Sequence, residues 1–187
     1  MVILFFDFKT MITKHIVFVL LLSLLYSIFR YNIFGNISWS DIPTFVFNKS
    51  ISFSMIIILA LATFSLNRGS IDEFTDYMKV IKLFSIVHVL ISINLLSLEY
   101  YPKLMENNKL SLSGNWALLF GVLTFAVLFN TFKINNLILY LLLAFHVFFI
   151  GFKSWLNIEK WNGYMPPITL ICFLLIIFVI IKLRIKQ

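Results

Sequence analysis

The sequence predicts an all-α protein, an integral membrane six-helix bundle in which residues 1–187 form a single transmembrane domain. The composition is 61% hydrophobic and only 12% charged, with a mean hydropathy of +0.98, which is far more apolar than a water-soluble globular protein. The apolar residues, 22 phenylalanines among them, come in long blocks and not at amphipathic spacing, as in membrane-spanning segments. Short stretches rich in Pro, Gly, Asn and charge divide these blocks into six.

The six predicted spans are residues 15–29, 51–66, 80–98, 116–132, 134–152 and 168–181. No small-x-small cleavage site follows the first, so we expect a span there and not a cleaved signal peptide. The second follows a break that contains Gly35 and Pro43. Because it is shorter than the roughly 20 residues that a perpendicular helix needs, we expect it to extend backwards over residues 44–47. The third span follows a charged connection at residues 67–79.

The last three spans are separated by equally clear breaks. The connection before the fourth span contains Pro102 and Gly114, and Lys133 marks a short turn between the fourth and fifth spans. Pro166 and Pro167 precede the sixth span, where proline favours the start of a helix.

The charge distribution predicts the partners and the orientation. The formal net charge is +7, but the basic residues are scattered between apolar blocks and form no stripe of the kind that nucleic acid requires. We therefore expect a lipid bilayer as the partner and no nucleic acid. Counted on alternate sides, nine Lys and Arg face six, so the positive-inside rule predicts both termini in the cytoplasm, in a bacterial cytoplasmic membrane.

Two histidines, His88 and His146, lie inside the third and fifth predicted spans. An imidazole in hydrocarbon is costly unless it has a partner, such as another side chain, a water chain or a metal. The third and fifth spans run in the same direction, and counting from Lys79 and Lys133 puts the two rings within about one helical turn in depth. Both could therefore reach one haem iron. They could equally face each other across a proton path without iron, or hydrogen-bond between helices in a structural subunit.

The neighbours of each histidine suggest how it could be held. Ser85 and Ser92 lie on the same helical face as His88, so we expect a serine or a backbone carbonyl to orient the imidazole. Apolar contacts around His146 would come from Leu142, Leu143, Phe149 and Ile150. His15 lies beside Lys14 at the start of the first span, and we expect it at the membrane interface, at a different depth.

Other chemistries have little support in the sequence. Cys172 is the one cysteine, which excludes an internal disulfide, an iron–sulfur cluster held by this chain alone and covalent haem attachment. No G-x-G-x-x-G motif is present for a dinucleotide. Whether the chain is an enzyme stays open; an oxidoreductase subunit without its own flavin or nicotinamide domain is the form we consider.

Several stretches from about Ile51 to the C-terminus resemble the ferric reductase-like transmembrane domain family, six-helix membrane proteins that hold haem b. The stretches are Lys82 to Ser92, Glu99 to Lys103, Leu110 to Asn115 leading into Gly121, Ala144-Phe145-His146 with Gly151 and Trp155, and Met165 to Leu170.

The resemblance implies a stand-alone membrane module that transfers electrons. His88 and His146 would be the axial ligands of one haem b, which would receive electrons from quinol or a separate flavoprotein and pass them to an acceptor at the far face. Many family members carry a second histidine on these helices for a second haem, but the corresponding position here falls near Lys133. One haem is therefore expected, with Lys82, Lys103 and Lys153 as candidates to bind its propionates.

Overall fold

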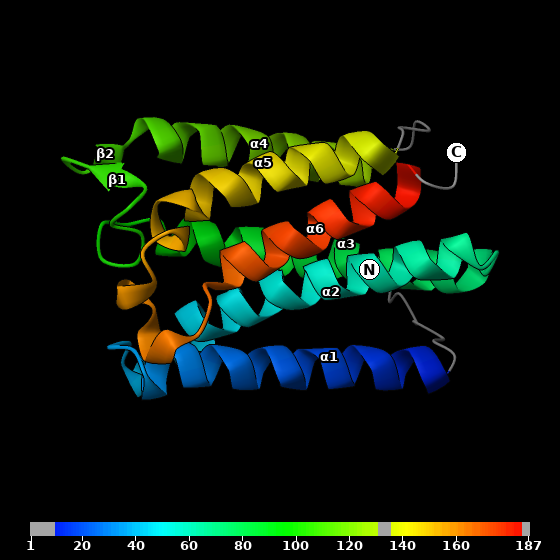
Figure 1. Ribbon diagram of the computed structural model, residues 1–187, viewed down its shortest axis with the longest axis horizontal. Helices are drawn as coiled ribbons and strands as arrows, with labels where there is room; N and C mark the ends of the chain where they lie inside the picture. The colour runs from blue at the N-terminus through cyan, green and yellow to red at the C-terminus, as the bar shows by residue number, and fades with distance from the viewer. Residues whose placement is uncertain (1–9, 131–135, 185–187) are drawn as a thin grey trace, which may run out of the picture.

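The computed structural model describes residues 10–130 and 136–184, and Figure 1 shows the helices lying side by side. They are α1 (Thr10–Ile28), α2 (Phe47–Asn67), α3 (Ile71–Leu95), α4 (Leu112–Phe129), α5 (Asn136–Trp155) and α6 (Ile168–Arg184). All six are long and apolar enough to cross a membrane, so the predicted all-α class is confirmed. The chain is an integral multi-pass membrane protein.

The predicted boundaries need correction, most of all at the second span. Continuous helical structure there begins at Trp39 and runs to Asn67, so the expected backward extension over residues 44–47 is confirmed and the helical structure starts earlier still. Residues Ile42–Val46 form a π-helical turn with Pro43 in its first positions, where a missing amide hydrogen costs nothing. The third helix begins at Ile71 and not at residue 80, because its acidic first turn favours a helix N-terminus. The predicted boundaries at residues 132 and 134 lie outside the described residues.

The helices pack around α2, the most buried of the six. Helices α1, α3 and α6 contact α2, α5 contacts α4 and α6, and α3 meets α4 only lightly. Two buried hydroxyls, one in α1 and one in α2, bond to their own helix: Ser27 and Ser54 donate to the carbonyls four residues earlier, at 2.8 Å in both cases. Their small side chains allow close helix approach without leaving polar groups unpaired in the hydrocarbon region.

The two ends of the bundle differ. What we call the loop end carries residues 29–46, 96–111 and 156–167; the terminal end is where α1 begins, α6 ends and α2 turns into α3 (Figure 1). At the loop end, β1 (Met105–Glu106) pairs antiparallel with β2 (Lys109–Leu110). Asn107 and Asn108 form the turn at φ 51° and 59°, a left-handed conformation that asparagine tolerates. The sequence did not predict this small hairpin.

The connection between α5 and α6 is fastened to the end of α1. Tyr26 donates a hydrogen bond to the carbonyl of Pro166 at 2.7 Å, and the buried Arg30 guanidinium donates to the carbonyl of Met165. In return, the Asn162 amide donates to the carbonyl of Arg30 at 3.2 Å. These bonds hold segments more than 130 residues apart in sequence together over the loop end.

Candidate functional site

The two histidines singled out by the sequence lie at matching depth, near the loop end. His88 is seven residues before Leu95, the last residue of α3, and His146 is nine residues before Trp155, the last residue of α5. At about 1.5 Å per residue they lie roughly 10 Å and 14 Å from these helix ends. The imidazoles are also close enough to interact electrostatically.

His88 is held by α2 and not by its own helix. Its Nδ1 lies 2.7 Å from the Oδ1 of Asn48, a fully buried residue near the start of α2. The Asn48 amide nitrogen donates to Ser92 Oγ at 2.9 Å and to the Tyr101 hydroxyl at 3.4 Å. Ser85 instead donates to the carbonyl of Lys82 at 2.8 Å. The expectation that a serine orients His88 directly is therefore wrong, and Ser92 acts only through Asn48.

His146 is held by α4. Its Nδ1 lies 2.7 Å from the carbonyl oxygen of Ala117. The ring lies against Gly121, where an added Cβ would lie 2.8 Å from both Nδ1 and Cε1 of His146. A glycine at this position lets the imidazole approach the backbone of α4 closely.

The partners of the two histidines determine where the ring protons lie. A carbonyl oxygen and an amide oxygen only accept hydrogen bonds, so Nδ1 of His146 and of His88 must each donate. Each neutral imidazole then presents an Nε2 lone pair. Among the described residues, neither Nε2 has a hydrogen-bond partner. Anchoring Nδ1 to an oxygen while Nε2 stays open is the usual arrangement of a metal-binding histidine.

A row of stacked aromatic side chains lies on α4 and α5, and its α5 members are close to His146 in the sequence. Phe120 stacks on Phe149 with a centroid separation of 5.7 Å and an interplanar angle of 5°, and on Phe145 at 5.0 Å. Trp116 extends the stack, 6.1 Å from Phe149. Helices α3 and α5 themselves are not in broad contact. The two imidazoles therefore come from helices that pack against different neighbours, α3 against α2 and α5 against α4 and α6.

A second cluster of aromatic residues covers the site at the loop end. Phe45 packs edge-on to Tyr31 at 5.3 Å and is stacked with Tyr100 at 5.6 Å. Tyr100, in the connection after α3, donates a hydrogen bond to Asp41 Oδ1 at 3.1 Å. This bond raises the pKa of the Tyr100 phenol above its ordinary value, because loss of its proton would put a second negative charge beside the carboxylate.

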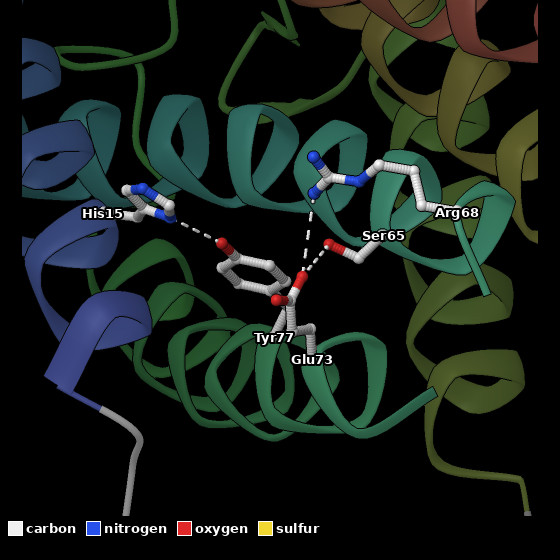
Figure 2. A network of polar contacts seen from close by, with 5 residues as sticks. All are labelled: His15, Ser65, Arg68, Glu73 and Tyr77. Carbon is white, nitrogen blue, oxygen red and sulfur yellow. Dashed lines mark hydrogen bonds and ion pairs between the residues drawn. The ribbon is translucent and has the colours of Figure 1, made fainter. Parts of the chain in front are cut away.

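His15 belongs to a different cluster, at the terminal end (Figure 2). Its Nδ1 lies 2.9 Å from the hydroxyl of Tyr77 on α3. Nearby, Glu73 accepts a hydrogen bond from Ser65 at 2.9 Å and pairs with Arg68 at 3.6 Å. The structure therefore separates His15 from His88 and His146, as the difference in predicted depth required.

Sequence reasoning missed the residues that hold the two rings. Asn48 lies within the expected backward extension of the second span, but nothing in the sequence marks it as the partner of His88. Ala117 contributes only its backbone carbonyl, for which no side-chain signal exists. Lys133, near which the position of a second ligand falls, lies outside the described residues.

Comparison with known proteins gives no further identification. No protein-family model matches the chain, and no curated protein matches it. Within the described residues, no group of three or more His, Cys, Asp or Glu side chains is placed to hold a metal ion. The chain is a six-helix membrane protein whose most specific chemical feature is the pair of imidazoles.

Proposed function

We propose that this protein transfers electrons in a membrane and holds one haem b between His88 and His146. The observation that carries the proposal is that each imidazole is fixed through Nδ1 and presents an open Nε2 at a similar depth. Haem iron with two histidine ligands undergoes reversible one-electron reduction, which is the chemistry that the group supplies.

The chain's own residues would set the properties of that site. Asn48 and the Ala117 carbonyl fix the tautomer and orientation of the rings, and by accepting the Nδ1 protons they make each Nε2 a better donor. The stacked Phe120 and Phe149 and the surrounding helices keep water away. Both iron coordination positions would be taken by histidine, so the site is suited to passing electrons more than to binding a substrate at the metal.

The partners follow from what the sequence lacks. It contains no G-x-G-x-x-G motif for a nicotinamide cofactor, so quinol in the bilayer or a separate flavoprotein is the proposed electron donor. The acceptor would be at the other membrane face, as in the ferric reductase-like proteins that the sequence resembles. In this proposal the terminal end faces the bacterial cytoplasm.

The direct test is a reduced-minus-oxidised absorption spectrum of detergent-purified protein from haem-replete cells, with a pyridine haemochrome assay for stoichiometry. We expect a b-type spectrum at about one haem per chain. His88→Ala and His146→Ala should each lose it, whereas His15→Ala, which changes a histidine at the terminal end, should keep it.

Two results would contradict the proposal. An unchanged spectrum in both His88→Ala and His146→Ala would refute the ligand assignment. A colourless wild-type protein that conducts protons in liposomes in a pH-dependent way would replace haem with the proton-path alternative.

A further inference from the structure

Lys49 is a cation placed among the residues of the histidine site. It follows Asn48 in α2, and its half-buried side chain reaches the aromatic residues of the loop end. The ammonium lies 4.4 Å from the ring centroid of Tyr101 and 5.1 Å from that of Phe45. It also interacts electrostatically with both His88 and His146.

In the part of the chain that the structure describes, no carboxylate neutralises this charge. Lys49 forms no ion pair with any Asp or Glu in residues 10–130 and 136–184. A lysine at membrane depth is costly without a counter-charge, and the attraction of two aromatic faces offsets only part of that cost. A site built in this way favours an anion.

We infer that Lys49 binds a carboxylate of the porphyrin, that is, a haem propionate. The inference rests on the proposed function, since it requires haem between the two histidines. A carboxylate beside an ammonium forms a charge-assisted hydrogen bond that strengthens where water is excluded. Lys49 lies within electrostatic reach of both histidines and against the aromatic rings of Phe45 and Tyr101, so it is placed to meet a propionate of a haem held between them.

Two of the lysines suggested by the sequence, Lys82 and Lys153, and the nearby Arg30 are less well placed. The ammonium of Lys82 lies 5.8 Å from the ring centroid of Phe129, the last residue of α4, towards the terminal end. Lys153 is exposed near the end of α5. Arg30, also at the loop end, donates to the carbonyl of Met165. None of these three has a described interaction with both imidazoles.

The test measures retention of two porphyrins by the full chain in detergent. Apoprotein is reconstituted with haem b or with haem b dimethyl ester, in which the propionates carry no charge, and loss to excess haem scavenger is followed by absorbance. Lys49→Met should release haem b about ten-fold faster than wild type, the loss expected for one charge-assisted hydrogen bond. With the dimethyl ester, wild type and Lys49→Met should release at the same rate.

Two control variants separate charge from packing. Lys153→Met makes the same substitution at an exposed lysine of the same end and should retain haem b like wild type. Lys49→Arg keeps the charge and should restore most of the retention, which also tests the inference if Lys49→Met fails to fold.

The outcomes separate this inference from the proposed function. If Lys49→Met retains haem b like wild type, or loses haem b and the ester equally faster, Lys49 does not bind a propionate although the histidine site stands. If Lys49→Arg behaves like Lys49→Met, the charge is not the cause and the inference fails. If wild type binds neither porphyrin, the proposed function itself fails.

Discussion

The histidine site at the loop end and the polar cluster at the terminal end both place an imidazole Nδ1 against an oxygen of another helix. They differ in whether that oxygen fixes the position of the ring proton. At the terminal end, Tyr77 offers His15 a hydroxyl that can donate or accept, and Glu73 is matched by Ser65 and Arg68. At the loop end, oxygens that only accept fix the tautomers of His88 and His146.

This difference shows why a histidine in an apolar segment is by itself a weak sign of function. The cluster in Figure 2 joins α1, α2 and α3 through the His15–Tyr77 contact and the two bonds of Glu73, as expected of a structural clamp. The loop-end site has two buried ring nitrogens without a hydrogen-bond partner and one lysine without an ion pair among the described residues, as expected of a site that receives a ligand. The predictions below test this distinction.

The largest expected effect is that of removing a ligand. His146→Ala should abolish the haem spectrum, because it removes one of the two histidines that would hold the haem in the proposed site, whereas His15→Ala should leave haem content within error of wild type. Haemochrome assays on protein matched for folding by far-UV circular dichroism measure both. Equal loss of haem in the two variants would contradict the proposed difference between the loop-end site and the terminal-end cluster.

Next in size is the support of His88. Asn48→Leu removes the oxygen that accepts the Nδ1 proton, and loss of such an outer partner costs about 10- to 100-fold in metal affinity. We expect haem affinity to fall within that range, as measured by titration of apoprotein. Asn94→Leu is the matched control, since exposed Asn94 bonds only to a carbonyl of its own helix. Equal affinities of these two variants would exclude an orienting role for Asn48.

Two glycines should give opposite results. Gly121→Ala would put a Cβ 2.8 Å from two atoms of the His146 ring, so we expect haem affinity to fall several-fold. Gly69, in the turn between α2 and α3, has φ +83° and open space around it. Gly69→Ala should therefore cost about 1 kcal/mol of stability through backbone strain and leave haem affinity unchanged. Titration and thermal unfolding distinguish the two, and a larger haem effect from Gly69→Ala would contradict the arrangement.

The smallest effect should come from the terminal-end clamp. Tyr77→Phe removes the hydroxyl that contacts His15, and interhelical hydrogen bonds in membrane proteins contribute about 0.6 kcal/mol on average. Thermal unfolding in detergent should shift by a few degrees at most, with the haem spectrum unchanged. Loss of haem in Tyr77→Phe would show that the two ends are coupled.

The sequence predicted the six helices well because blocks of apolar residues need no tertiary information. It missed the true start of the second helical segment, because Pro43 read as part of a break although helical structure already begins at Trp39. Pro43 fits a first helical turn, and Asn48 finds partners on α3, a match that emerges only when helices 40 residues apart in sequence pack together. Counting residues along the third and fifth spans was enough to predict that His88 and His146 lie at a similar depth. No sequence pattern could indicate a backbone carbonyl at Ala117.

The depth of the histidine pair has a consequence for bioenergetics. Moving one elementary charge through a whole membrane is worth about 2.3 kcal/mol per 100 mV. The pair lies roughly 10 to 14 Å from the helix ends at one face of a hydrocarbon core of about 30 Å. An electron exchanged with the loop-end face would therefore cross less than half of the voltage, about 1 kcal/mol per 100 mV. An electron exchanged with the opposite face would cross the larger part of the membrane voltage. The dependence of the electron-transfer rate on voltage would therefore show from which face the proposed haem is reduced.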